Sequence, residues 1–278
     1  GIGNGLAIVA ARSYGAQDED LLKKTVAGSL VIGFLSSLCI TLAGLVGLHP
    51  LLVLLDTPAE ILEEAYSYIL IIDVGVLVMF AYNLCAGLLR AIGNSFMPLV
   101  FLLISSGLNV ALDLVFIAVV GMGVKGAAVA TVISQGVSVV LCIFYVLRKT
   151  RVLVPERKHF QVGRKLYWDL FSQSISMGLM SSIVSAGSVV LQYGINGLGT
   201  LVIAGHTAAR KMFAFTDMPL IAMANAGSTF VSQNYGANHP DRVRRGMRDI
   251  YLYSVVAAVA AVLLMAAGAE WMVKLVSG

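Results

Sequence analysis

Long apolar stretches separated by short polar segments divide the chain into eight parts. Most stretches contain 20 or more residues with few charges, and about 20 apolar residues are needed for a helix to cross a bilayer. Only the first stretch is too short to cross. The pattern predicts an all-α polytopic membrane protein with about eight spans, at 1–16, 26–48, 61–89, 97–120, 124–147, 166–194, 200–235 and 249–269.

The composition agrees with this pattern. Of the 278 residues, 58% are hydrophobic and 12% are charged, whereas a soluble domain carries about 25% charged residues. So little charge excludes a soluble globular enzyme, a disordered chain and a disulfide scaffold. The net charge of +4 is mild. The expected environment is therefore the lipid bilayer, and no nucleic-acid partner is predicted.

Basic residues gather in alternate loops. Fifteen of the 19 Lys and Arg residues lie in or just before four loops, whereas the loops between them carry few. Because Lys and Arg are enriched on the cytoplasmic side of multi-pass proteins, we expect these loops to be cytoplasmic and the protein to lie in the plasma (inner) membrane. The four loops are 17–25, 90–97, 148–165 and 236–248.

The chain also repeats itself. Tyr14-Gly15-Ala16 recurs as Tyr235-Gly236-Ala237, and Asp20 recurs as Asp241, always at the same spacing, which we call the repeat offset. The two copies are six segments apart, so both enter the membrane in the same direction, as in transporters built from parallel repeats. Two complete copies would make about 442 residues and twelve spans in such a plan. We therefore expect this chain to be a fragment that lacks the first span and the last three.

One long polar linker interrupts this plan. It predicts an N-terminal lobe at 1–150, a cytoplasmic inter-lobe loop at 151–164 and a C-terminal lobe at 165–278. The result is a two-lobe helical bundle with parallel six-helix repeats.

Acidic residues inside predicted spans point to function, because an Asp near the bilayer centre costs about 2.5–3.5 kcal/mol. Asp73, Asp113 and Asp217 are such residues. At 1.5 Å per residue, Asp113 and Thr131 both lie about 10 Å below the outer boundary. Asn109 and Gln135 lie one turn deeper, at about 16 Å, and Asp73 lies at about 12 Å. We expect Ser105, Asn109 and Asp113 to form a polar stripe on one helix that faces Thr131 and Gln135 on the next.

This arrangement can hold a cation. A carboxylate with neutral oxygens from Asn109 and Thr131 suits Na⁺, and desolvation also lets a buried Asp carry a proton. Both coupling ions, H⁺ and Na⁺, stay open, and so does a purely structural role for Asp113 as a hydrogen-bond hub. Asp73 is assigned either to the same site or to packing. The roles of Asp217, Arg210 and Lys211 stay open: Asp217 can cap a broken helix, and the two basic residues can line an outer vestibule or extend to the membrane surface.

Several stretches resemble the multidrug and toxic compound extrusion (MATE) family of transporters, and the resemblance covers all 278 residues. Each motif alone is moderately specific, but their order and spacing in two copies strengthen the match. The stretches are Gly1–Ala16, Gly87–Pro98, Leu108–Ile117, Gly126–Thr131 and Val231–Ala237.

The resemblance implies a twelve-helix, two-lobe antiporter that exports amphiphilic, often cationic, compounds in exchange for H⁺ or Na⁺. Family members that couple in the N-terminal lobe use matching residues as the cation site, which implies this role, and a possible Na⁺ site, for Asn109, Asp113 and Thr131. The family site also uses an Asp on the first helix, for which this chain has no counterpart.

The substrate cavity is predicted from polar and flexible side chains. The segment 166–194 is rich in Ser and Gln, which can form a weakly polar cavity wall or simply allow close helix packing. Methionine supplies an adaptable apolar lining. The candidates are Gln135, Met180, Ser185, Ser188 and Gln192.

Other functions remain as alternatives. A related lipid-linked saccharide flippase needs a basic central cavity, for which Arg210 and Lys211 are candidates, although the buried acids argue against it. A membrane-embedded enzyme needs a catalytic constellation, and none is found, so the protein is predicted not to be an enzyme. A membrane scaffold does not explain the polar stripe at Asn109 and Asp113. No cofactor is expected beyond the coupling ion, and the protein is expected to be a monomer that binds small molecules.

Overall fold

The computed structural model describes residues 1–54 and 59–277, and these residues contain helices and no strand. The long α-helices match the apolar segments. They are α1 (Ile2–Gly15), α2 (Glu19–Leu54), α3 (Ala59–Val74), α4 (Val76–Ala91), α5 (Phe96–Asp113), α6 (Val124–Lys149), α7 (Arg164–Asn196), α8 (Thr200–Gly236) and α9 (Pro240–Ser277); three shorter elements are η1 (Leu114–Val119), η2 (Arg151–Leu153) and η3 (Arg157–Phe160).

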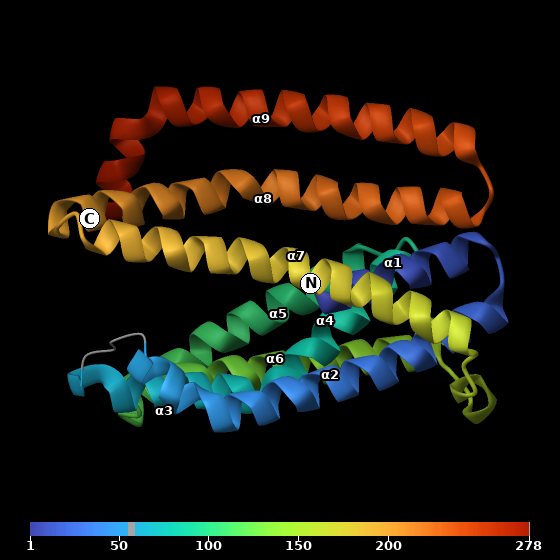
Figure 1. The fold of residues 1–278 in the computed structure, drawn as a ribbon, viewed down its shortest axis with the longest axis horizontal. Helices are drawn as coiled ribbons and strands as arrows, with labels where there is room; N and C mark the ends of the chain where they lie inside the picture. Colours follow the sequence, from blue (N-terminus) through green and yellow to red (C-terminus); the bar gives the residue numbers. More distant parts are fainter. Residues whose placement is uncertain (55–58, 278) are drawn as a thin grey trace.

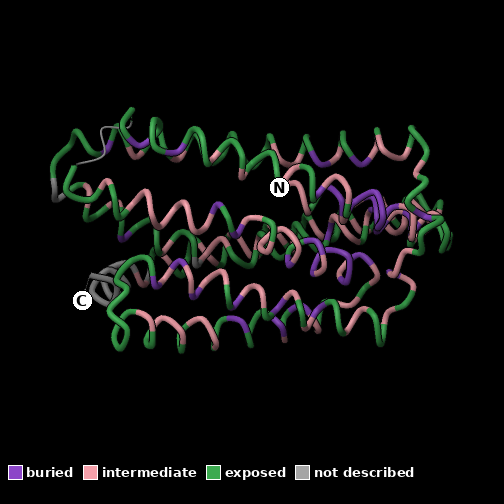
Figure 2. Tube along the Cα trace, turned by 90° about the horizontal axis from the view of Figure 1, so that it is seen from below, coloured by how far each residue is buried: buried purple, intermediate pink, exposed green. Residues whose placement is uncertain are grey.

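Five helices of the described chain are long and apolar enough to cross a membrane, or six if α3 and α4 form one bent span. Their outward side chains are apolar: Ile183 is 71% exposed and Val262 is 60% exposed. In water such exposure would be unfavourable, but in lipid it costs nothing. Figure 2 shows exposed residues along the outer helices and buried ones concentrated between them. The chain is a multi-pass membrane protein.

Two predicted spans do not meet the same test. α1 has 14 residues, and α8 has 37 but no stretch of 18 among its described residues that is apolar enough for a membrane span. The charged residues Arg210, Lys211 and Asp217 within α8 account for the difference. All eight predicted segments are nevertheless helical.

The predicted segment 61–89 is not one straight helix. α3 and α4 meet at Gly75 with a bend of 47°. Gly75 packs against Val132 of α6, and a Cβ at Gly75 would lie 2.5 Å from a Val132 methyl group. The close approach of α6 therefore depends on a residue without a side chain at the bend.

The helices form two groups joined by α1 (Figure 1). α2 to α6 pack together in one group, α8 packs along α9 in the other, and α7 lies beside α8. α1 contacts α2 and α4 on one side and α7 and α8 on the other. α1 is therefore the central helix of the described chain, and its residues Leu6, Val9 and Ala10 are fully buried.

α1 and α8 cross through a reciprocal glycine contact. A Cβ at Gly15 would overlap the carbonyl oxygen of Gln233, and a Cβ at Gly236 would overlap the carbonyl oxygen of Arg12. Gly15 and Gly236 are separated by the repeat offset, and so are Arg12 and Gln233. The same two positions of each copy thus meet the other copy, as expected for repeats related by a twofold axis.

The turns after these helices also match. Gln17 and Asn238, again separated by the repeat offset, both have φ of 56°. The backbone N–H of Ala16 donates to Arg12 at 3.0 Å, and that of Ala237 donates to Gln233 at 2.9 Å. The sequence repeat is therefore also a repeat of backbone conformation.

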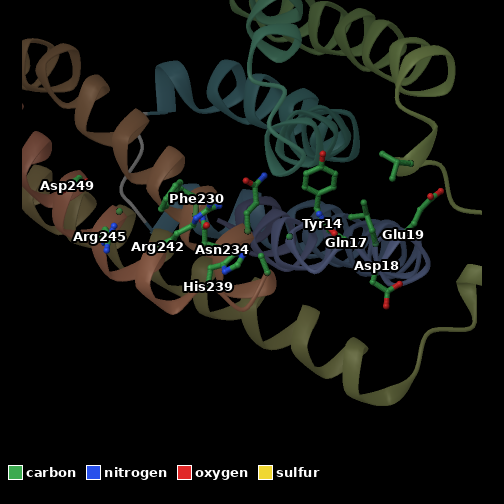
Figure 3. Close-up of a pocket in the computed structure, with 16 residues that line it drawn as sticks. Tyr14, Gln17, Asp18, Glu19, Phe230, Asn234, His239, Arg242, Arg245 and Asp249 are labelled. Atoms are coloured by element: carbon green, nitrogen blue, oxygen red, sulfur yellow. The ribbon is translucent and has the colours of Figure 1, made fainter.

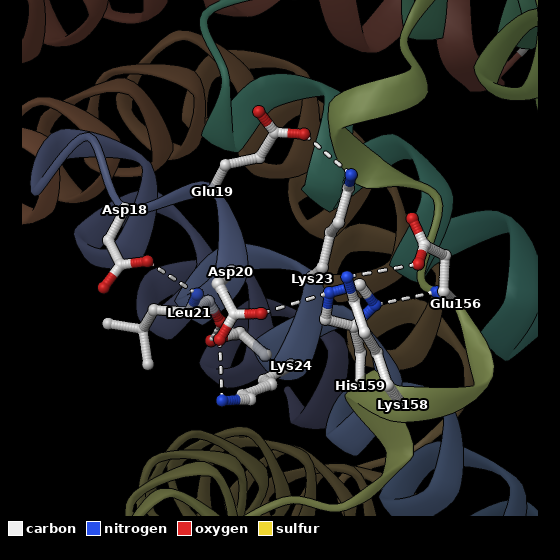
Figure 4. A network of polar contacts seen from close by, with 10 residues as sticks. Asp18, Glu19, Asp20, Leu21, Lys23, Lys24, Glu156, Lys158 and His159 are labelled. Carbon is white, nitrogen blue, oxygen red and sulfur yellow. Dashed lines mark hydrogen bonds and ion pairs between the residues drawn. The ribbon is translucent and has the colours of Figure 1, made fainter.

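The polar linker is attached to the start of α2 (Figure 4). His159 is 2% exposed, its Nε2 lies 3.3 Å from Asp20 Oδ1, and its Nδ1 accepts from the backbone N–H of Glu156 at 2.9 Å. Two ion pairs within α2, Lys23–Glu19 and Lys24–Asp20, lie beside this contact. The linker is consequently an ordered segment built around one buried imidazole.

We expect His159→Ala to loosen this linker. The change removes both ring contacts and leaves the Glu156 amide without its acceptor, which costs about 1–3 kcal/mol. Amide hydrogen exchange across residues 151–163 should accelerate by roughly tenfold or more. Lys158→Ala is the control, because the exposed Lys158–Glu156 pair contributes little. Unchanged exchange in His159→Ala would contradict the anchoring role.

Candidate functional site

The outer part of α5 changes its helical form at Asp113. The α-helix ends at Asp113 and continues as a π-helix over Leu114–Val119, with the Val120 N–H donating to the Val115 carbonyl at 2.9 Å. Glycines with positive φ at Gly121 and Gly123 then turn the chain into α6. Short π segments in helices occur frequently at functional sites, and here one begins directly after a carboxylate.

Asn109 and Thr131 meet where α5 packs on α6, and Asp113 lies one turn further along α5. Asn109 Nδ2 donates to Thr131 Oγ1 at 3.5 Å, and Thr131 Oγ1 donates to the Ala127 carbonyl at 2.9 Å. Asp113 lies one turn beyond Asn109 on the same face of α5. Its Oδ1 is buried and has no hydrogen-bond partner among the described residues. The site thus offers an unpaired carboxylate oxygen beside an amide and a hydroxyl.

The register differs from the expected one by about one turn. Asn109, rather than Asp113, lies opposite Thr131, and Ser138 Oγ donates to the Phe101 carbonyl at 3.0 Å in the same register. A π-helix has more residues in each turn than an α-helix, so α5 needs more residues to reach the same height. The polar stripe on α5 therefore contacts Thr131 of α6 through Asn109, one turn away from the residue expected at the same depth.

Asp73 lies on a different helix interface. It is 9% exposed at the end of α3, and Thr41 Oγ1 of α2 donates to its backbone carbonyl at 2.9 Å. Its carboxylate packs against Gly44 of α2, and Oδ2 has no partner in the described chain. The structure shows no hydrogen bond between Asp73 and Asn109, Asp113 or Thr131 among the described residues. Asp73 is thus a buried acid at the α2–α3 interface, next to the bend at Gly75.

Gly44 provides the space for this carboxylate. We expect Gly44→Ala to destabilise the protein by about 1–3 kcal/mol, because its methyl group would overlap the Asp73 carboxylate. In an Asp73→Ala background the same change should cost far less, since the obstacle is gone. The difference is measured by thermal unfolding, in detergent micelles, of the wild type, the two single variants and the double variant. Equal costs in both backgrounds would show that the contact does not matter.

A small cavity of about 290 Å³ lies between the two repeats. We call it the inter-repeat pocket; helices α1, α4, α7 and α8 line it. Six of its residues form three pairs, and the two residues of each pair are separated by the repeat offset. The pocket therefore lies where equivalent positions of the two copies meet. These pairs are Asn4 with Asn225, Ala7 with Ser228, and Ile8 with Thr229.

The predicted substrate-cavity residues do not share one cavity. Met180 lines the inter-repeat pocket. Ser185, Ser188 and Gln192 line an open groove of about 440 Å³ on α7, together with Arg210 of α8. Gln135 lies on α6, away from both, with a buried Oε1 that has no partner among the described residues. The inter-repeat pocket was not predicted, although the repeat offset already relates its paired residues.

A larger open cavity, of about 860 Å³, lies where the ends of α1 and α8 meet the start of α9 (Figure 3). Acidic side chains come from the α1–α2 turn, the start of α2 and α9, and basic ones from the α8–α9 turn and α9, so the charge of the cavity is mixed. Beside it, Arg12 of α1 pairs with Asp169 of α7, and Gln233 Nε2 donates to the Ala91 carbonyl at 2.7 Å. The residues that line the cavity, labelled in Figure 3, include Tyr14, Asp18, Glu19, His239, Arg242 and Arg245.

Comparison with known proteins identifies the family of the chain. The MatE family model matches residues 1–115 and 177–278. The probable multidrug resistance protein YpnP of Bacillus subtilis (strain 168) is 32% identical over 197 residues, which are 69% of this chain and 43% of that protein. YoeA of the same organism, also a probable multidrug resistance protein, is 26% identical over 272 residues, 95% of this chain and 59% of that protein.

Solved structures show the same fold. An outward-facing MATE family transporter is 22% identical with a TM-score of 0.87, covering 99% of this chain and 61% of that one. MATE in its straight conformation gives 22% identity and a TM-score of 0.85, with 99% and 62% coverage. The chain spans about half the length of the curated relatives it matches. The expected resemblance is confirmed: the chain belongs to the MatE family, whose members are transporters and not enzymes.

Proposed function

We propose that the protein is a secondary active antiporter that exports small amphiphilic compounds, cationic ones included, in exchange for H⁺ or Na⁺. The observation that carries this proposal is the buried Asp113 oxygen without a partner in the described chain, one turn from the Asn109–Thr131 hydrogen bond. Anionic and neutral oxygens grouped within a membrane span suit a small cation. No group other than the coupling ion is needed as a cofactor.

The relatives support the transported class. YpnP and YoeA are named as probable multidrug resistance proteins, and MepA of Staphylococcus aureus is named as a multidrug export protein. MepA of strain NCTC 8325 is 23% identical over 238 residues. By analogy, the substrates of this protein are small drug-like molecules.

We further propose that the protein lies in the plasma membrane as a monomer. The loops 17–25, 90–97, 148–165 and 236–248 are then cytoplasmic, because they hold most of the basic residues. The lobes are residues 1–150 and 165–278, joined by the linker 151–164. In this orientation the α1–α8 crossing at Gly15 and Gly236 lies near the cytoplasmic side.

The two-lobe arrangement suggests how coupling works. Binding of a cation at Asp113 would favour one packing of the α5–α6 pair within the N-terminal lobe. A ligand shifts a conformational equilibrium only as far as it binds one state better than the other. The lobes would then move against each other about the α1–α8 crossing, which exposes the inter-repeat region to each side in turn.

Transport under separate ion gradients tests this function. Protein containing these 278 residues is reconstituted in vesicles loaded with a fluorescent amphiphilic cation. We expect release of the dye when a Na⁺ gradient or a pH gradient is imposed, and none from vesicles without protein. Release that ignores both gradients would contradict antiport.

A further inference from the structure

Charge in the inter-repeat pocket is unbalanced. Arg90 of α4 is the one charged residue in its lining, and no acidic residue of the described chain lines it. Arg90 also forms no ion pair and no hydrogen bond with another described side chain. Within the described residues, the pocket therefore carries a net positive charge without an internal counterion.

The guanidinium of Arg90 points back along its own helix. α4 ends at Ala91, so a side chain seeking water or lipid headgroups would extend past this end. Instead, the guanidinium lies beside Gly87, one turn earlier in α4. A Cβ built on Gly87 would be 4.0 Å from Arg90 Nη2 and 3.0 Å from the Ala7 methyl group of α1. Arg90 is thus held against α1 at the pocket, half-buried between the two repeats.

A half-buried guanidinium needs a partner. It presents five N–H donors in a planar fork that matches carboxylate and phosphate oxygens. Keeping this charge away from bulk water is unfavourable unless an anion or acceptors balance it. The described chain supplies no acid here, and the anionic group of a ligand would provide the counter-charge.

The rest of the lining fits the remainder of such a ligand. Asn4 and Asn225, from the two repeats, add amide donors. Met177, Met180 and Ile221 supply an adaptable apolar wall. A pocket with one cation, a few polar groups and an apolar wall is typical of sites for small amphiphiles.

We infer that the inter-repeat pocket binds the anionic group of an amphiphile, a carboxylate or a phosphate, at Arg90, with its apolar body against Met177 and Met180. This rests on the proposed function only in that the bound amphiphile would be a transported compound. It adds anionic and zwitterionic amphiphiles to the expected cationic ones, because Arg90 repels a cation from this pocket.

Binding of three probes that share a naphthalene ring and differ in the charge of one small substituent tests the inference. The probes are 2-naphthoate, 2-naphthamide and 2-naphthylmethylammonium, titrated by calorimetry into the protein in nanodiscs of zwitterionic lipid. We expect the carboxylate to bind about tenfold more tightly than the amide, the size of one charge-assisted hydrogen bond, and the ammonium to bind most weakly. Nanodiscs with anionic lipid separate the two sources: weaker naphthoate binding there identifies a lipid headgroup as a competing ligand.

Variants connect the preference to one side chain. Arg90→Gln should remove the preference for the carboxylate and retain amide binding, which also reports that the variant folds. Arg90→Lys should keep part of the preference, and Arg157→Gln, a matched change at an exposed site, should keep all of it. A carboxylate preference that survives Arg90→Gln, or tighter binding of the ammonium to the wild type, would overturn the inference. Because these are binding measurements, failure of antiport would leave their outcome intact.

Discussion

Replacing Asp113 by Asn is expected to reduce export driven by an ion gradient by about 10- to 100-fold, the range of a typical coupling free energy. The amide keeps the shape of the side chain but removes the charge that holds a Na⁺ ion or a proton. Asn109→Ala and Thr131→Ala should have smaller effects, because each removes one neutral oxygen and leaves the carboxylate. Dye release from vesicles under each gradient measures the loss.

The control for this prediction is an acid outside the site. Glu63 is exposed near the start of α3, so Glu63→Gln makes the same change of charge without touching the α5–α6 interface. Its transport should equal that of the wild type. Normal gradient-driven export by well-folded Asp113→Asn would show that Asp113 only stabilises the packing of α5 on α6.

The second large effect is expected at the α1–α8 crossing. Gly15→Val and Gly236→Val each place a branched side chain where the backbone of the other repeat lies, at Gln233 and Arg12 respectively. Overpacking of this kind costs about 1–3 kcal/mol, and more where backbone must move. Because the two contacts are reciprocal, we expect similar losses of thermal stability from the two variants.

The double variant distinguishes a shared contact from two unrelated ones. Once one valine has separated α1 from α8, the second meets less resistance, so the combined loss should fall short of the sum of the single losses. Gly47→Val is the matched control, because a Cβ at Gly47 of α2 meets no atom within 4 Å. Additive losses, or a loss at Gly47 as large as at Gly15, would contradict the reciprocal contact.

Local pattern and repetition predict much of this fold. All eight apolar segments are helical, because burial in lipid requires every backbone group to be bonded within its own segment. The repeated Tyr-Gly-Ala turns lie together in space with matching φ at Gln17 and Asn238. Such features depend on residues close in sequence or on a symmetry visible in the sequence itself.

Other features depend on contacts between distant residues. Gly75 at the bend packs against Val132 of α6, and the Asp73 carboxylate packs against Gly44 of α2. The expected depths of Asn109 and Asp113 rest on a uniform rise of helix per residue, and the π-helical segment after Asp113 does not have the rise of an α-helix. The position of Arg90 in the inter-repeat pocket was also unpredictable, since a basic residue at a helix end usually marks the membrane boundary.

Direct measurement of cation binding at Asp113 tests the central claim most sharply. Binding of radioactive Na⁺ and protonation of carboxyl groups, followed by infrared difference spectroscopy, are measured on the purified wild type, Asp113→Asn and Asp73→Asn. We predict that one of the two signals is present in the wild type and in Asp73→Asn and is lost in Asp113→Asn. An undiminished signal in Asp113→Asn would contradict the assignment of the coupling ion to this site.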